Sequence, residues 1–178
     1  MLPKYKTLFN IFPIKKHIDE SLTHKWAYEL IDFEPTSILD IGVGDGYNLY
    51  FLLNRFEKAD ACGITSSEKK IRNASKLNHE FIENKRLEIG LMDKFGLPYR
   101  DDNFDLVTIF KRKPTVEDLK EYYRVIKPNG YILLGGRKDN QFDPKINEYL
   151  EEAGFSDIEM AVEERKKRFA IKAKKTKL

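Results

Sequence analysis

The sequence predicts an α/β fold built on a doubly wound, mostly parallel β-sheet. Short apolar runs alternate with amphipathic helical stretches, which is the pattern of βαβ units and a parallel sheet. A glycine-rich turn follows the first apolar run, and in such sheets ligands bind beyond the carboxyl ends of the strands. The last two apolar runs are joined only by a charged turn, so we read them as two strands that follow one another directly.

The first four elements follow from periodicity. Apolar residues recur every four positions over residues 14–32, which predicts a helix that a nearby proline ends. The apolar run 37–41 is the first strand, and the glycines of residues 42–46 end it. A second helical stripe covers residues 47–56, and a second apolar strand covers residues 59–64.

The middle of the chain predicts a helix and two strands. The helix starts at Thr65, since Glu68 stands three residues later as a capping box requires, and its apolar stripe runs to Phe81. Strands are expected at residues 86–91 and 104–110. The second of these is nearly all apolar, which is typical of a strand that is covered on both faces.

The last elements are two helices and three strands. A helix is predicted over residues 116–126, and a Pro-Asn-Gly turn then leads into a strand at residues 131–134. A further helix over residues 146–153 stops at a glycine, which is typical of a helix C-cap. The final two strands are expected at residues 158–162 and 168–173.

Composition bounds the class of protein. The 178 residues fit one domain, and 41% hydrophobic with 34% charged residues excludes a disordered chain. The apolar runs are far below the ~20 residues that span a bilayer, and the N-terminus lacks the pattern of a secretory signal. The single cysteine, Cys62, cannot form an internal disulfide, which fits a reducing compartment. We therefore expect a cytoplasmic protein without a membrane span.

Basic residues gather at the C-terminus. Residues 165–178 hold eight Lys or Arg residues and no acidic residue, while the rest of the chain is mildly acidic. Alternation over the first part of this run predicts a half-buried final strand, which leaves only Lys174 to Leu178 free. Three free lysines are too few for tight nucleic-acid binding, so we expect a frayed terminus rather than an RNA anchor.

The glycine-rich turn is the strongest site signal. Gly42, Gly44 and Gly46 let the backbone turn tightly and let a ligand approach without side-chain clashes. The following helix favours a negative group at its N-terminus, and Asp40 at the strand end favours a cation. Together they suit an amino acid zwitterion. The dinucleotide fingerprint G-x-G-x-x-G is disfavoured, because its third glycine would stand where Tyr47 does.

Three runs resemble one enzyme family. Ile38-Leu-Asp-Ile-Gly-Val-Gly-Asp-Gly46 resembles the first motif of the class I, seven-strand S-adenosylmethionine-dependent methyltransferases. Residues 97–107 resemble the run that leads into their fourth strand, and residues 124–134 resemble the motif that opens their fifth. The three runs lie in the family's order and cover roughly residues 35 to 135, and they are most similar to the branch with small-molecule and quinone-type enzymes.

The resemblance implies a Rossmann-like, seven-stranded sheet that ends in an antiparallel hairpin. It implies one domain overall, with a methyltransferase domain at residues 35–178 and an N-terminal helical cap segment at residues 1–34. That segment is long enough to cover a substrate, and its aromatic residues could equally pack on the core.

The resemblance also implies S-adenosyl-L-methionine as the cofactor and places its binding residues. Carried over by position, Gly42, Gly44 and Gly46 line the methionine part with Asp40 near its amino group, Asp93 accepts from the adenine amino group, Met92 and Lys94 flank the ring, and Phe110 and Lys111 close over the cofactor. Thr65 and Ser66 stand where the family has an acid for the ribose hydroxyls. Relatives of cyclopropane-fatty-acid synthase share Thr65's surroundings, Glu68 could substitute one turn on, and helix capping is the alternative role of Thr65.

The catalytic residue stays unknown at this point. Tyr5, His17, Tyr28 and Lys111 to Lys113 are candidates for a base by position only. His17 and His24 share a helical face and are expected to be surface histidines, and no metal site is expected. We expect methyl transfer to a small-molecule acceptor. The alternatives are a cofactor-binding or regulatory protein with little turnover and an RNA-directed methyltransferase.

Overall fold

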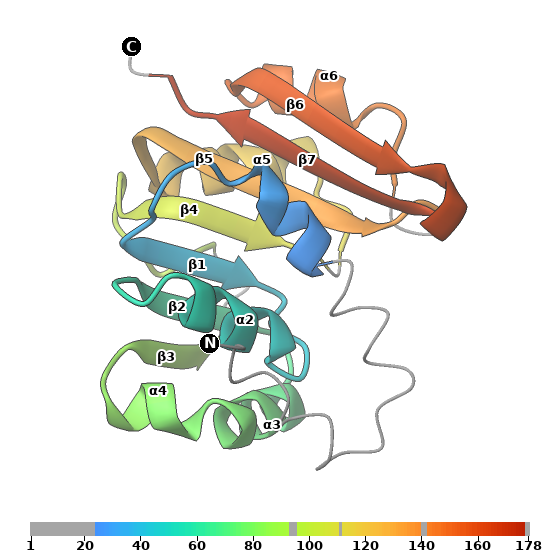
Figure 1. Cartoon of the computed structure of the whole chain (residues 1–178). Helices are drawn as coiled ribbons and strands as arrows, with labels where there is room; N and C mark the ends of the chain where they lie inside the picture. Colours follow the sequence, from blue (N-terminus) through green and yellow to red (C-terminus); the bar gives the residue numbers. More distant parts are fainter. Residues whose placement is uncertain (1–23, 93–95, 111, 140–141, 177–178) are drawn as a thin grey trace.

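The computed structural model describes residues 24–92, 96–110, 112–139 and 142–176, which form a central seven-stranded sheet with helices on both faces (Figure 1). The strand order is β3-β2-β1-β4-β5-β7-β6. The strands are β1 (Ser37–Ile41), β2 (Asp60–Thr65), β3 (Leu87–Leu91), β4 (Phe104–Ile109), β5 (Ile126–Arg137), β6 (Ser156–Glu163) and β7 (Arg168–Lys174). The first five pair in parallel, and β7 runs antiparallel to both β5 and β6. The predicted fold class is confirmed.

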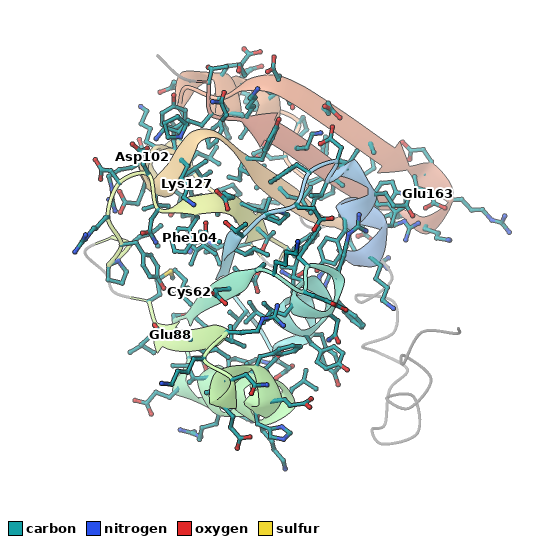
Figure 2. The ribbon with its side chains drawn as sticks, turned by 60° about the vertical axis from the view of Figure 1, so that its left-hand side comes forward. Cys62, Glu88, Asp102, Phe104, Lys127 and Glu163 are labelled. Atoms are coloured by element: carbon teal, nitrogen blue, oxygen red, sulfur yellow. The ribbon has the colours of Figure 1, made fainter. Side chains whose placement is uncertain are left out.

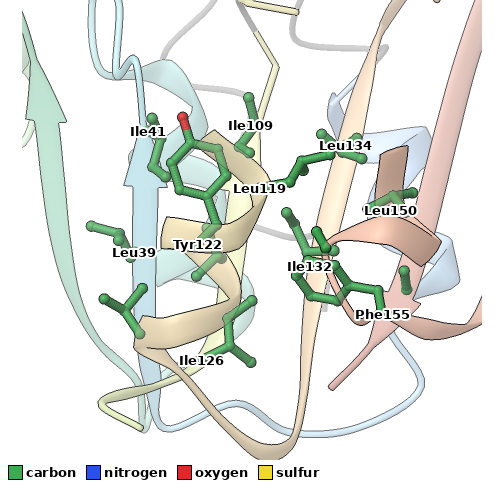
Figure 3. Close-up of a cluster of buried hydrophobic side chains, with 14 of the residues drawn as sticks. Leu39, Ile41, Ile109, Leu119, Tyr122, Ile126, Ile132, Leu134, Leu150 and Phe155 are labelled. Atoms are coloured by element: carbon green, nitrogen blue, oxygen red, sulfur yellow. The ribbon is translucent and has the colours of Figure 1, made fainter. Parts of the chain in front are cut away.

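Two apolar cores lie on the two faces of the sheet. The helices are η2 (Tyr28–Leu30), α2 (Tyr47–Arg55), α3 (Glu68–Leu77), α4 (His79–Glu83), α5 (Val116–Val125), α6 (Ile146–Glu152) and η3 (Glu164–Lys166). Helices α5 and α6 cover one face, where Leu119, Tyr122 and Leu150 pack on the strands (Figure 3). Helices α2 and α3 cover the other face, together with the N-terminal segment at residues 24–33. Burial on both faces explains why the central strands read as continuous apolar runs.

The strand order places a binding crevice at β1 and β4. The chain passes from β1 outward to β3 and then returns to β4, which pairs with β1 on its other side. Sheets of this kind bind ligands where the strand order reverses, beyond the carboxyl ends of the strands. The glycine turn after β1 lies at this point. None of the helices in the described part of the chain has the length and apolar content that crossing a bilayer requires.

Two details of the predicted helix at residues 65–81 are wrong. Thr65 is the last residue of β2, and the N-cap of α3 is Ser67, whose Oγ accepts from the Lys70 N–H at 3.4 Å. The helix also breaks at Asn78, whose side chain turns back to donate to the carbonyls of Gly46 and Ala74. Asn78 is 1% exposed, so these bonds replace the water that it would otherwise need.

The Pro-Asn-Gly sequence is not a simple turn before the fifth strand. Strand β5 begins at Ile126, directly after α5, and its pairing with β4 shifts register between the partners of Phe104 and Leu106. This irregular first part of β5 is bonded to Lys175, the residue directly after β7. Asn129 donates its N–H to the carbonyl of Lys175 at 2.7 Å, and Lys175 donates back to Gly130 at 2.9 Å.

The basic C-terminal run is largely consumed by the fold. Strand β7 lies between β5 and β6 and is buried on both faces, not half-buried. Lys172 is 3% exposed, and its Nζ forms ion pairs with Asp32 at 3.0 Å and Glu159 at 3.1 Å. Three further ion pairs involve this run: Lys166 and Arg168 each with Glu163, and Lys175 with Asp102. The expectation that Lys175 is free is therefore wrong.

The carboxylate of Asp105 joins the first residues of β1, β4 and β5 at the amino edge of the sheet. Asp105 Oδ2 accepts from the N–H and Oγ1 of Thr36, at 2.8 and 2.7 Å, and from the N–H of Ser37 at 3.0 Å. Its Oδ1 accepts from Lys127 Nζ at 2.9 Å, and Figure 2 shows Lys127 at this edge. Burial opposes the charge, but these donors outweigh it and hold the pKa of Asp105 well below its usual range.

We expect Asp105→Asn to lower the free energy of unfolding by about 2 kcal/mol at pH 7, because it removes a charged acceptor that four donors at the starts of two other strands share. Urea unfolding measures the loss, with Asp60→Asn at an exposed position of β2 as the control.

The pH dependence has a definite sign, because the folded pKa of Asp105 is depressed. Its contribution is complete above the unfolded pKa of about 4 and is lost as pH falls toward the folded pKa. The stability difference between the parent and Asp105→Asn should therefore shrink below pH 4. A difference that is constant down to acid unfolding would contradict this account.

Candidate active site

Backbone hydrogen bonds hold the glycine turn against the end of β2. The N–H groups of Gly42 and Val43 donate to the carbonyl of Ile64 at 2.8 and 3.3 Å. Gly42, Gly44 and Gly46 have φ angles of 80°, 55° and 89°, in the left-handed region that favours glycine. The three predicted glycines are thus a requirement of the backbone, whatever ligand the turn meets.

Gly46 also lets helix α3 approach. A Cβ at this position would lie 2.6 Å from Asn78 Nδ2 and 2.8 Å from Ala74 Cα, so a side chain there would displace the helix. Asp45 beside it forms an ion pair with Lys70 of α3 at 2.9 Å. Gly46 therefore serves close packing of the turn on α3.

A buried polar network lies beneath the turn. The Oδ1 of Asp40 accepts from Asn48 Nδ2 at 2.5 Å and from Thr108 Oγ1 at 2.7 Å, and Asn48 Oδ1 accepts from the hydroxyl of Tyr28. All four side chains are at most 4% exposed. A buried carboxylate is tolerated when donors satisfy it, so this network fixes β1, β4, α2 and the N-terminal segment to one another. Burial raises the pKa of Tyr28, and the charge of Asp40 adds to the shift, which keeps this phenol a donor.

The predicted residues of the second and third strands meet at the same edge. Thr65 is 7% exposed, and its carbonyl accepts from the Met92 N–H at 2.9 Å, while Ser66 is exposed. Met92 Sδ in turn contacts Arg112 Nη1 at 3.7 Å, just past β4. Arg112 is held by both carboxylate oxygens of Asp118, each at 3.0 Å. Contacts therefore follow one another along the carboxyl edge of the sheet, from β1 to the segment after β4. Asp93, Lys94 and Lys111 lie outside the described residues.

Phe110 is buried between β5 and the N-terminal segment. A Cβ on Gly135 would lie 2.4 Å from Phe110 Cε1, so the absence of a side chain on β5 makes room for this ring. The ring centroid lies 4.3 Å from that of His24 and 6.0 Å from that of Tyr28. His24 is only 4% exposed, so its prediction as a surface histidine is wrong.

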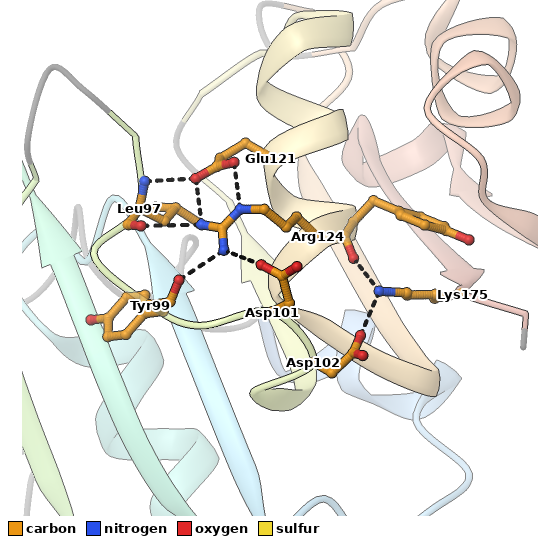
Figure 4. Close-up of polar contacts among 8 residues, drawn as sticks. Leu97, Tyr99, Asp101, Asp102, Glu121, Arg124 and Lys175 are labelled. Atoms are coloured by element: carbon orange, nitrogen blue, oxygen red, sulfur yellow. Dashed lines mark hydrogen bonds and ion pairs between the residues drawn. The ribbon is translucent and has the colours of Figure 1, made fainter.

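Arg124 ties two of the motif runs together (Figure 4). Its guanidinium donates to the carbonyl of Tyr99 at 2.8 Å and to that of Leu97 at 3.2 Å. Glu121 accepts from both Arg124 and the Leu97 N–H, the latter at 2.9 Å, and the Arg124 hydrogen bond lowers the pKa of Glu121. An arginine in the run 124–134 thus fixes the backbone of the run 97–107, which follows β3 and its site residue Met92.

Sequence reasoning missed Asn48, Thr108 and the role of His24. Two of these leave a signal, because Asn48 stands on the apolar stripe of its helix and Thr108 is the one hydroxyl in an apolar strand. A polar residue at a buried position points to a partner. The partner itself follows from register, since Asp40 and Thr108 are paired positions of β1 and β4.

Comparison with known proteins gives one consistent result. A family model described as "Methyltransferase domain" matches residues 38–130. Norajmaline N-methyltransferase of Rauvolfia serpentina is 27% identical over 121 residues, which is 66% of this chain and 41% of that protein. The chain thus spans about four tenths of the length of this relative.

Two solved structures share the fold. A SAM dependent methyltransferase of Aquifex aeolicus has a TM-score of 0.74 at 21% identity, covering 90% of this chain and 96% of the other. Phosphoethanolamine N-methyltransferase 2 of Haemonchus contortus, solved with S-adenosyl-L-methionine, has a TM-score of 0.71 at 16% identity, covering 86% and 52%.

We expect Asn48→Leu to lower the free energy of unfolding by roughly 3 kcal/mol, because it leaves buried Asp40 and Tyr28 without a shared partner. Asn54→Leu is the matched control in the same helix. Its amide is only half-buried and donates to the Tyr50 carbonyl, so its loss should stay below about 1 kcal/mol. Equal losses in urea unfolding would show that the network does not carry the stability assigned to it.

Proposed function

Because the chain belongs to the methyltransferase-domain family, we propose that it transfers a methyl group from S-adenosylmethionine to a small-molecule acceptor. The observation that supports this most directly is the glycine turn between β1 and α2, which lies at the point where the strand order reverses. The family match and the solved neighbour with S-adenosyl-L-methionine bear out the expected class of cofactor.

The described residues fit this cofactor. Gly42 and Gly44 place no side chains on the turn, and α2 begins directly after it, so its N-terminal N–H groups favour a carboxylate. Asp40 lies beneath the turn as a buried carboxylate, which favours an ammonium group above it. The bound cofactor supplies a methyl group on a positively charged sulfur, which makes that carbon open to attack.

The other residues keep the roles that position suggests. Thr65 at the end of β2 would meet the ribose, with exposed Ser66 beside it. Met92 would pack on the adenine, with Asp93 and Lys94 next to it along the chain. The contact of Arg112 with Met92 closes this part of the edge from the β4 side, next to Lys111. Phe110 would line the side of the site that faces the N-terminal segment, because its ring packs on His24 of that segment.

A small acceptor is the class for which two of the similar proteins are named, whereas other relatives are named for an acyl-carrier protein and for tRNA U34. The plant relative is named for norajmaline and the nematode enzyme for phosphoethanolamine. The RNA-directed alternative depended on a free basic C-terminus. Lys172 and Lys175 are held in ion pairs, which leaves that region less basic charge to offer to phosphates.

A cofactor-binding protein with little turnover is the second candidate. Thr65 favours it, because a hydroxyl replaces the carboxylate that would bind two ribose hydroxyls. Losing a charged hydrogen-bonding partner weakens binding by about 1.5–3 kcal/mol. The structure leaves Thr65 available for this contact, since Ser67 caps α3 in its place.

We expect S-adenosylhomocysteine at 100 times its dissociation constant to stabilise the fold by about 2.7 kcal/mol, whereas NAD at the same concentration leaves it unchanged. The turn lacks the third glycine of the dinucleotide fingerprint, which is the reason for the difference. Thermal unfolding with each ligand measures the effect. Stabilisation by NAD alone would overturn the methyltransferase proposal.

We expect Thr65→Asp to tighten S-adenosylmethionine binding, because a carboxylate can accept from both ribose hydroxyls. The same change should lower the stability of the ligand-free protein, since Thr65 is 7% exposed and a buried charge is costly. Ser67→Asp is the matched control: an aspartate caps α3 as well as serine does, so both affinity and stability should hold. Calorimetry on the three proteins decides: unchanged affinity in Thr65→Asp would remove Thr65 from the ribose contact, and a large loss of affinity would contradict this account.

A further inference from the structure

The N-terminal segment descends along the sheet from its carboxyl edge. The ring of Trp26 lies under the guanidinium of Arg168, at 4.5 Å, and Arg168 is paired with Arg137, the last residue of β5. Six residues further on, Asp32 reaches Lys172, which lies beside Leu133 in the middle of that strand. The segment therefore runs opposite to the parallel strands, and its earlier residues lie nearer the site.

His24 precedes Trp26 and lies at the level of the strand ends. Its ring packs at 4.3 Å on Phe110, the first residue after β4. It also stands four residues before Tyr28, so about one helical turn, or ~5.4 Å, separates it from the Tyr28 backbone toward the carboxyl edge. The hydroxyl of Tyr28 reaches Asn48 in the first turn of α2. His24 is thus placed beside the layer in which the glycine turn and the end of β4 lie.

We propose that His24 borders the reacting atoms and accepts the proton that the acceptor loses during methyl transfer. This inference rests on the proposed function and deepens it, because it implies that the methylated atom is a nitrogen or oxygen that carries hydrogen. Imidazole is suited to the task, since its ordinary pKa of about 6.5 leaves it neutral and basic near pH 7. A base of matched pKa near the operating pH is the efficient choice for such a transfer.

The step balances with the groups named. The acceptor nitrogen or oxygen forms the bond to the methyl carbon and loses its N–H or O–H proton. That proton bonds to an imidazole nitrogen of His24, and the other product is S-adenosylhomocysteine, whose sulfur keeps the electron pair of the broken bond. His24 then returns the proton to water. Phe110 packs on the imidazole ring and holds it in place, and Tyr28 in turn packs on Phe110.

The proposal can be tested without knowing the acceptor, because the two forms of the cofactor differ in charge. S-adenosylmethionine carries a positive sulfonium where S-adenosylhomocysteine carries a neutral thioether. A nearby positive charge disfavours protonation of imidazole. The surrounding charged and titratable groups stay the same in both complexes: they are Lys25 and Tyr28 on the same segment, Asp40 on β1 and Arg168 on β7.

The experiment follows the histidine resonances of the full chain by NMR across pH 5 to 9, with each ligand at saturation. His24→Gln assigns the His24 signal, and His79, exposed on α4, is the internal control. We expect His24 to titrate at a lower pH with S-adenosylmethionine than with S-adenosylhomocysteine, because a positive sulfonium beside the imidazole opposes its protonation. The pKa of His79 should be the same in both complexes.

The outcomes separate this inference from the proposed function. Thermal unfolding first establishes whether both ligands bind, and failure of both would overturn the function and this inference with it. If both bind and His24 titrates identically in the two complexes, or does not titrate in the S-adenosylhomocysteine complex, then His24 is a packing residue and the inference is wrong. His24→Gln adds a second readout, because loss of a proton acceptor should leave the dissociation constant of S-adenosylhomocysteine within about twofold. A tenfold or larger loss in a folded variant would assign His24 to cofactor binding instead.

Discussion

The buried carboxylate of Asp40 is the constraint on which the site depends. A charge at 2% exposure is sustained only by donors that reach it from the surrounding elements. Asn48 supplies one and thereby sets where α2 starts, and Thr108 supplies another and thereby pins β4 beside β1. Tyr28 extends the network to the N-terminal segment through Asn48. Strands β1 and β4, helix α2 and the N-terminal segment are therefore joined through the Asp40 carboxylate, directly under the turn that the family uses for its cofactor.

The three motif runs have different physical reasons for being where they are. The glycine run satisfies left-handed backbone angles and the close approach of α3 at Gly46. The other two runs belong together, because Arg124 and Glu121 hold the backbone of residues 97–101. A short segment that joins β3 to β4 without a helix among its described residues gains its definition from this clamp. The clamp contributes bidentate, charge-assisted hydrogen bonds in addition to the burial of Leu97 in the core.

Sequence patterns predict helices and strands, because these follow from regular spacing along the chain. They do not identify contacts between residues that lie far apart in the sequence. The place of every strand along the chain was predictable, because apolar runs and turns leave few arrangements, whereas the antiparallel hairpin that ends the sheet came from the resemblance to the family. Thr65 and Ser67 are both suited to cap α3, and the capping-box spacing assigned the cap to Thr65. Strand β2 instead extends to Thr65, because its pairing with β3 continues to that residue, and Ser67 is the cap. His24 looked exposed because one helix shows two faces, and the face that packs is decided by Phe110, eighty-six positions later. The same holds for Asn48, whose burial is visible in the pattern and whose partners are not.

The ion pair between Asp32 and Lys172 joins positions 140 residues apart, which determines when the N-terminal segment docks during folding. Closing so long a loop carries an entropic cost that grows with the logarithm of its length, so the segment can dock only after the sheet has assembled. The element that docks last is also the one that is released with least loss of other contacts. We therefore expect the backbone amides of residues 24–31 to exchange with solvent faster than those of β1 and β4, and equal protection would argue against it. Transient release of this segment would open a path over β4 and β5, so that a substrate could enter without any hinge between domains.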